Sequence, residues 1–177
     1  MTIRVQMKVE EFERVRSYLL GDPRGDERAA FLLVERAKAA RAFALVEIEF
    51  QKGADLAESS RGYLELRDGV LEKLVGSAHA RGYALIEAHS HPFDRSKSTR
   101  FSGIDCDGLE DVAPQLVWRL PGRPYGALVF GKRSFDSLYW ETRSKKPTGP
   151  IEIRVGRRTH RPTGLTFRDW ESGYGSI

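Results

Sequence analysis

The 177-residue chain is 40% hydrophobic and 31% charged, with a net charge of +4. This composition predicts one globular domain that is long enough to bury a core. The single cysteine, Cys106, excludes an internal disulfide and a cysteine-rich zinc site. No apolar run approaches the roughly 18 residues of a membrane span, and no signal-peptide core follows Met1. We therefore expect a cytoplasmic protein that does not insert into membranes.

The first third of the chain predicts a helix followed by a β-hairpin. Apolar residues at helical spacing indicate a helix over about 8–20, which the glycines and proline of 21–25 end. Two apolar runs, 28–36 and 42–50, then predict strands that pair as a long hairpin. A polar loop is expected over 51–60.

The next segment predicts a short strand, a helix and a buried central strand. The short strand covers 63–66, and Asp68 is the expected N-cap of a helix that runs to about 80. Gly82 is the expected glycine after its last turn, and His79 is assigned a helix-end role. The apolar run 83–89 is typical of a strand in the interior of a sheet.

Two histidines close the central strand. His89 and His91 are separated by one residue, so on a strand they lie on one face while Ser90 points away. Pro92 ends the strand, and Asp105 returns at the start of the following helix. Two imidazoles and one carboxylate form a common catalytic zinc set that leaves a fourth position for water.

The helix that begins near residue 104 contains Pro114, which we expect to kink or divide it. The runs 125–131 and 134–141 predict two further strands. Within the central strand Glu87 is expected to meet a polar partner or solvent. Together these elements predict a mixed sheet with helices on both sides.

The last part of the chain differs in character and is expected to form a basic extension, 143–177. Its first residues resemble a linker, and 151–155 alternates like an edge strand or one that pairs with a partner. Phe167 and Trp170 could dock the extension onto the domain or onto another chain, and His160 is expected to be exposed. Residues 141–177 carry eight basic and four acidic side chains, but they lack the alternation of aromatic and basic residues that RNA-binding modules use, so nucleic acid is not expected as a partner.

The motif His89-Ser90-His91-Pro92, followed after a loop by Ser102-x-x-Asp105, resembles the signature of the JAMM (MPN/JAB) metalloproteases, which include deubiquitinases. The stretch from Pro92 to Phe101 has ten residues, about three more than is usual in that family. The resemblance covers about residues 5 to 142. It implies an α/β (α+β type) fold for a domain over 1–142, with a mixed, mostly antiparallel central sheet flanked by helices.

The resemblance also implies two catalytic residues. Glu27 stands before an apolar run as the catalytic glutamate does in relatives, although Ala30 replaces the usual glycine. It would act as general base, and Ser102 would donate to the oxyanion of the tetrahedral intermediate. Three other acids compete with Glu27 but lie within strand-like runs: Glu35, Glu47 and Glu49.

The function that the resemblance implies is zinc-dependent hydrolysis, with one Zn²⁺ held by His89, His91 and Asp105. Short bacterial members of the family suggest an isopeptidase that releases or matures a ubiquitin-like protein, alongside the activating and conjugating enzymes of the same system. Two alternatives remain open: a metallopeptidase on small peptides or sulfur-carrier precursors, and a non-catalytic MPN-type binding scaffold. A thiol mechanism at Cys106 is not favoured, because no charge pattern around it suggests a lowered pKa.

Overall fold

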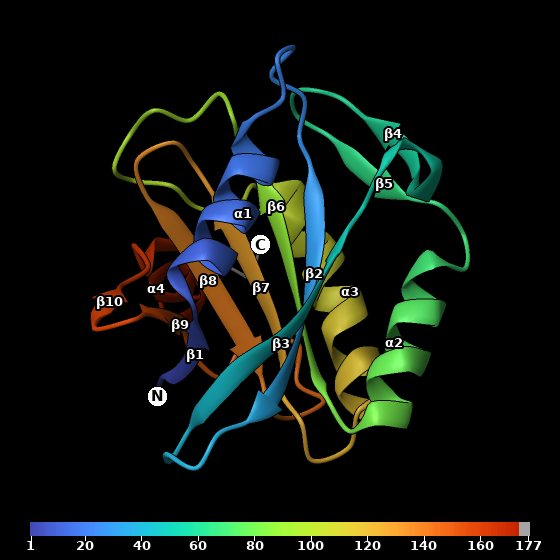
Figure 1. Ribbon diagram of the computed structural model, residues 1–177, viewed down its shortest axis with the longest axis vertical. Helices are drawn as coiled ribbons and strands as arrows, with labels where there is room; N and C mark the ends of the chain where they lie inside the picture. The colour runs from blue at the N-terminus through green and yellow to red at the C-terminus, as the bar shows by residue number, and fades with distance from the viewer. Residues whose placement is uncertain (174–177) are drawn as a thin grey trace.

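Eight strands form one mixed sheet in the computed structural model, which describes residues 1–173 (Figure 1). In sheet order they are β10 (Arg158–His160), β9 (Ile151–Val155), β1 (Ile3–Met7), β3 (Ala42–Phe50), β2 (Ala29–Arg36), β6 (Ala84–Ser90), β7 (Tyr125–Phe130) and β8 (Phe135–Trp140). Four of the seven pairings are antiparallel, and three (β1–β3, β1–β9 and β6–β7) are parallel. The expected mixed, mostly antiparallel α/β fold is confirmed.

Helices cover both faces of the sheet (Figure 1). Helix α1 (Val9–Leu20) packs on one face, and α2 (Val70–Arg81) and α3 (Gly103–Arg119) pack on the other. A short helix, α4 (Leu165–Glu171), contacts β8. A separate two-stranded sheet of β4 (Leu56–Ser59) and β5 (Leu64–Leu66) follows the 3₁₀ turn η1 (Gly53–Asp55). Within residues 1–173, none of the helices has the length and apolar character needed to cross a membrane.

The strands in the middle of the sheet are buried on both faces. In β2, Ala30 and Leu32 pack in the core under α1, whereas Phe31 and Leu33 pack in the core under α2 and α3. Strand β6 lies between β2 and β7, so the interior position expected for 83–89 is confirmed. The residue alternation of β6 places Leu85, and hence His89, on the side of α2 and α3.

The structure corrects the expected N-cap of one helix and excludes the expected division of another. The N-cap of α2 is Gly69 rather than Asp68, and Gly69 has a φ of 82°, which a glycine adopts without a steric penalty. Pro114 does not divide α3, which is assigned as one helix. Its neighbours Ala113 and Leu116 are buried, and this packing favours helix continuation in spite of the missing donor.

The C-terminal part of the chain completes the main sheet. Strand β9 is not an edge strand, because β1 pairs with it on one side and β10 on the other. His160 is half-buried rather than exposed, and its ring centroid lies 4.8 Å from that of Phe12. Trp170 is buried edge-on to Trp140, so the expected docking is confirmed. Residues 174–177 of the predicted extension lie outside the described part of the chain.

Candidate metal centre

The end of β6 presents two imidazoles toward one space. His91 continues the ladder beyond the strand, because its backbone N–H donates to the carbonyl of Phe130 at 2.8 Å. The ring centroids of His89 and His91 are 5.1 Å apart. Ser90 is fully buried, and its hydroxyl accepts a hydrogen bond from the backbone N–H of Arg28, which accounts for this serine without a role at the site.

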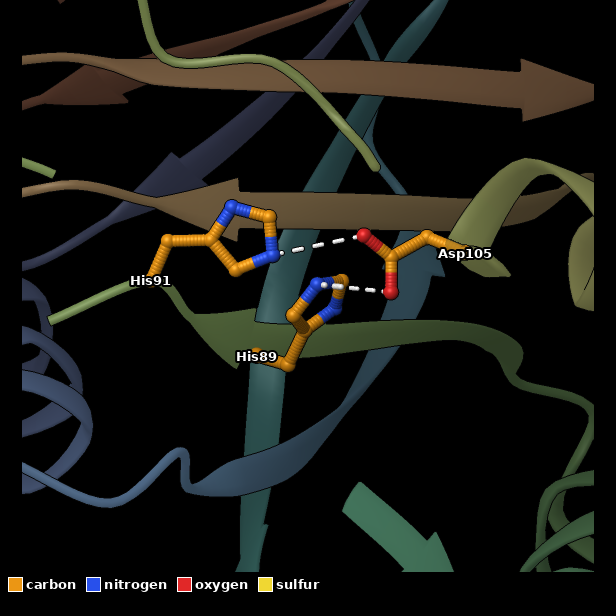
Figure 2. A group of neighbouring side chains, drawn as sticks. All are labelled: His89, His91 and Asp105. Atoms are coloured by element: carbon orange, nitrogen blue, oxygen red, sulfur yellow. Dashed lines mark ion pairs between the residues drawn. The ribbon is translucent and has the colours of Figure 1, made fainter. Parts of the chain in front are cut away.

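Asp105 approaches both histidines from the first turn of α3 (Figure 2). Its Oδ1 lies 3.5 Å from Nε2 of His89, and its Oδ2 lies 3.3 Å from Nε2 of His91. One ligand atom from each residue lies within 4.8 Å of the others. Tetrahedral bonds of about 2.0–2.1 Å place ligand atoms about 3.3 Å apart. The three residues are therefore close enough to bind one metal ion.

One buried atom of this group has no hydrogen-bond partner. Nε2 of His89 is buried, and among the described residues it makes no hydrogen bond, only the 3.5 Å ion-pair contact with Oδ1 of Asp105. Buried polar atoms nearly always have a partner, so an orphan calls for an explanation. A metal ion would satisfy this nitrogen, and the donor set therefore fits a metal.

The charges of the group hold it together without a metal. Burial alone would raise the pKa of Asp105, but His89 and His91 outweigh it and hold that pKa well below its usual range. Burial alone would lower the pKa of His89, but Asp105, together with Glu87 and Glu27, outweighs it and raises that pKa. The acids thus favour the protonated form of His89, and the histidines favour the ionised form of Asp105.

Glu27 lies beside this group without belonging to it. It precedes β2, is 4% exposed, and its Oε1 lies 3.7 Å from Nε2 of His91. Burial raises the pKa of Glu27, and the two histidines oppose that shift only in part. A buried carboxyl with a raised pKa next to a metal group can accept and return a proton.

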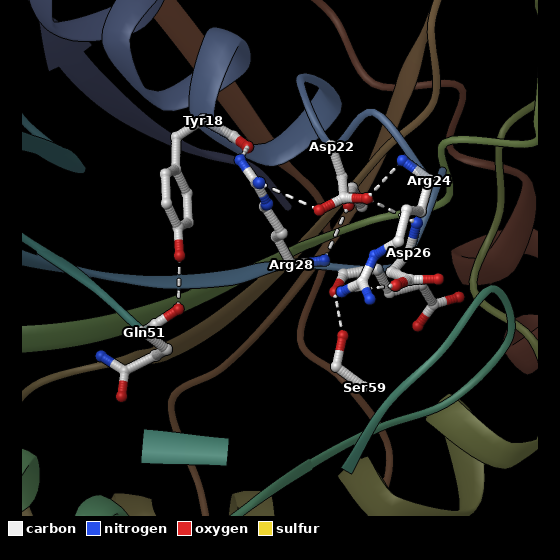
Figure 3. A network of polar contacts seen from close by, with 9 residues as sticks. Tyr18, Asp22, Arg24, Asp26, Arg28, Gln51 and Ser59 are labelled. Atoms are coloured by element: carbon white, nitrogen blue, oxygen red, sulfur yellow. Dashed lines mark hydrogen bonds and ion pairs between the residues drawn. The ribbon is translucent and has the colours of Figure 1, made fainter. Parts of the chain in front are cut away.

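Asp22, Arg28 and Ser59 belong to one polar network (Figure 3), and hydrogen bonds also fix the backbone at Glu27. Its N–H donates to the carbonyl of Ser60, and its carbonyl accepts from the hydroxyl of Ser59, both at 2.8 Å. Asp22 precedes Glu27 and Arg28 follows it, and the Asp22 carboxylate accepts a hydrogen bond from the Arg28 guanidinium at 2.9 Å. Ser59 ends β4, and Asp22 and Ser60 lie in connections between elements, so no sequence pattern indicated their part in positioning Glu27.

Ser102 is the N-cap of α3. Its hydroxyl accepts from the backbone N–H of Asp105 at 3.2 Å and donates to Oδ2 of Asp105 at 2.7 Å. The Ser102 backbone N–H donates to the same oxygen at 2.7 Å. Ser102 is exposed and lies at the site, but its hydroxyl proton is donated to the Asp105 carboxylate.

Two cavities flank the histidines and Asp105. One has a volume of about 400 Å³, reaches Glu27, His89 and Asp105, and has largely apolar walls. Those walls come from β2, β5, α2 and α3 and include Phe31, Leu64, Leu66, Leu71, Leu109 and Val112. The second has a volume of about 510 Å³ and lies between His91, Ser102 and residues of α4. The candidate metal centre is thus open to a ligand from two sides.

Other candidates from the sequence lie outside the centre. Glu87 lines the first cavity, and its carboxylate accepts a hydrogen bond from the Tyr125 hydroxyl, so its expected polar partner is confirmed. Burial raises the pKa of the Cys106 thiol to about 12, helped by Asp105, which disfavours a thiolate. Glu47 pairs with Arg81 on the surface.

Comparisons with known proteins add little. No protein-family model matches the sequence, and no curated protein matches it at a significant level. The solution structure of a protein from Desulfitobacterium hafniense resembles the chain at 14% identity and a TM-score of 0.47, over 85% of this chain and 93% of the other. A likeness this weak carries no argument about function.

Proposed function

We propose that this protein is a zinc metalloprotease of the JAMM type, an isopeptidase that cleaves a ubiquitin-like protein from a conjugate or precursor. The observation that carries the proposal is that, from two other segments of the chain, Asp105 approaches both histidines and Glu27 approaches His91. Three ligands with one acid beside them form the arrangement that metal-assisted amide hydrolysis requires.

Zinc is the metal that the donor set favours. Two neutral imidazoles and one carboxylate, with an open position, are typical of catalytic zinc sites, whereas calcium and magnesium prefer oxygen ligands. His89, His91 and Asp105 would hold the ion. When bound, zinc supplies a Lewis acid that lowers the pKa of a coordinated water to about 7.

The protein's own groups would carry the proton transfers. Glu27 accepts a proton from the attacking water at a carboxylate oxygen and returns it to the leaving amine. Its raised pKa suits both steps. The Ser102 hydroxyl would donate to the developing oxyanion, and to do so it must exchange its bond to Asp105 for one to the substrate.

The surroundings of the site suit an extended chain. Strand β5 lines the apolar cavity and pairs only with β4 among the described residues. An extended tail that adds a strand beside β5 would lead toward Asp105, and strand addition is a recurrent way to bind peptides. A flexible C-terminal tail of a ubiquitin-like protein fits this path, and the enzymes that activate and conjugate that protein are the expected partners.

The experiment that tests the proposal compares wild type with Glu27→Gln. We expect stoichiometric zinc in both proteins, cleavage of a purified ubiquitin-like conjugate by wild type, and a loss of about 10²–10⁴ in kcat for the variant. Glu13→Gln is the matched control, because Glu13 is exposed on α1 and lines neither of the two cavities beside the histidines. A short-peptide panel assayed in parallel shows whether small peptides are cleaved instead.

Two results would contradict the proposal in different ways. Full activity of Glu27→Gln would remove Glu27 from the mechanism. A wild-type protein that binds no zinc would favour a binding scaffold over an enzyme.

A further inference from the structure

The segment that leads into α3 is held by the C-terminal part of the chain. The backbone N–H of Phe101 donates to the hydroxyl oxygen of Thr166 at 3.1 Å. Two residues earlier, the carbonyl of Thr99 accepts from the Thr163 hydroxyl at 2.7 Å. Thr99, Phe101 and Thr166 are all buried, so these bonds are shielded from water. The far end of the long loop after Pro92 is therefore fixed by residues of the C-terminal segment.

A buried carboxylate fixes the orientation of Thr166. Asp136, at the start of β8, has no exposed surface. Its Oδ2 accepts from the Thr166 hydroxyl at 2.7 Å and from the Thr166 backbone N–H at 2.9 Å. Its Oδ1 accepts from the backbone N–H groups of Ser137 and Gly164, both at 2.9 Å. All four acceptor positions of Asp136 are in use. The single proton of the Thr166 hydroxyl is donated to Asp136. The hydroxyl oxygen therefore accepts the hydrogen bond from the Phe101 N–H.

The same path continues to the metal ligands. The Phe101 ring lies edge-on to His89, with the centroids 5.7 Å apart. The next residue, Ser102, caps α3 and donates two hydrogen bonds to Oδ2 of Asp105. A shift of Phe101 would therefore displace both His89 and Asp105.

We propose that Thr166 is a positioning residue of the metal centre, acting through Phe101 and Ser102 on Asp105, and that residues 163–170 are part of the functional site. The inference rests on the proposed metal centre but not on the identity of the substrate. It also explains how the loop after Pro92 still presents Ser102 and Asp105 to the histidines, although it is about three residues longer than is usual in the JAMM family.

The test measures zinc affinity by competition with a chelator, together with the thermal midpoint Tm. Thr166→Val keeps the shape of the side chain and removes the hydroxyl. We expect its zinc affinity to fall about 10- to 100-fold, the usual effect of losing a residue that orients a ligand. Thr166→Ser retains the hydroxyl and should keep wild-type affinity. Thr148→Val is the matched control, because it removes one side-chain hydrogen bond, to the Glu141 N–H, on a different loop.

The outcomes separate positioning from simple stabilisation. If Thr166→Val lowers Tm but binds zinc as tightly as wild type and Thr148→Val, the inference is overturned. If Thr166→Val does not fold, Thr163→Val decides. It removes the bond to Thr99 and the longer bond from the Leu165 N–H, and it leaves the bonds of Thr166 in place. Reduced zinc affinity relative to Thr148→Val supports the inference, and unchanged affinity overturns it. A wild-type protein without zinc affinity would instead count against the proposed function.

Discussion

The backbone N–H of Ser102 donates to Oδ2 of Asp105 at 2.7 Å, and the backbone N–H of Asp105 donates to the hydroxyl oxygen of Ser102 at 3.2 Å. This reciprocal pair is a capping box, which satisfies N–H groups that every helix leaves unpaired at its start. The same bonds orient the carboxylate toward His89 and His91. One Ser-x-x-Asp spacing thus begins α3 and orients Asp105, the proposed third ligand.

Ser102→Ala separates the role of Ser102 as a helix cap from its proposed role as an oxyanion donor. Loss of the cap should lower the free energy of unfolding by about 0.5–2 kcal/mol, and loss of an oxyanion donor should lower kcat by about 10²–10³. Ser102→Thr keeps the hydroxyl and should retain most of both. Chemical denaturation and single-turnover cleavage measure the two effects, and a change in stability alone would leave Ser102 as a cap.

Asp105→Asn tests the third ligand. The amide keeps the size of the side chain but loses the charge that attracts the metal and pairs with the histidines. We expect zinc affinity to fall by more than about 100-fold, beyond the usual effect of residues that only orient ligands. Asp107→Asn is the control, since Asp107 is exposed two residues further along α3. Equal zinc affinity in the two variants would exclude Asp105 as a ligand.

The strand spacing of His89 and His91 was sufficient to place their side chains on one face, and the apolar run before them was sufficient to predict an interior strand. Local pattern also predicted α1 and the β2–β3 hairpin. These features depend on the regular period of side-chain directions along a strand or helix, and the spacing of apolar residues in the sequence reveals that period.

Long-range pairing was harder to predict. Strand β9 pairs with β1 across almost the whole chain, in the register Ile3 opposite Ile151, and no local pattern specifies such a partner. Glu27 reaches the site because β2 pairs with β6, with Ala29 opposite His89. Only the resemblance to a known family, not the spacing of residues, singled out Glu27.

The stability of the metal-free protein and its affinity for zinc should change with pH in opposite directions. The pKa of His89 is raised in the folded protein, despite burial, by Asp105. A raised folded pKa contributes stability below the unfolded value of about 6.5, and that stability is lost as the pH rises through the folded value. Zinc needs neutral imidazoles, so its affinity increases with pH.

Thermal unfolding with and without zinc checks this expectation. The Tm of the metal-free protein should fall as the pH is raised above about 6.5, while the increase in Tm caused by zinc should grow over the same range. His79→Gln is the control, because His79 lies near the end of α2 and outside the metal group. A zinc effect that does not change with pH would argue against histidine ligands.

Gly108 offers a test of the apolar cavity that leaves the chemistry untouched. It lies in α3 and lines the cavity of about 400 Å³, and a Cβ added there would meet no atom within 4 Å. Gly108→Leu should fold at least as well as wild type, because a helical glycine costs about 1 kcal/mol relative to a good helix former. Its larger side chain would occupy the path proposed for the substrate tail.

We expect Gly108→Leu to bind zinc normally and to raise KM for a conjugate by about tenfold or more, in line with the effect of one or two misplaced methylenes in a binding pocket. Gly76→Leu is the matched control: Gly76 lies in α2 with equally open space but lines a different cavity. Because neither substitution touches a ligand or Glu27, a KM change confined to Gly108→Leu would locate the bound tail beside α3. Equal KM values for both variants and wild type would mean that the tail approaches from the side of His91 and α4 instead.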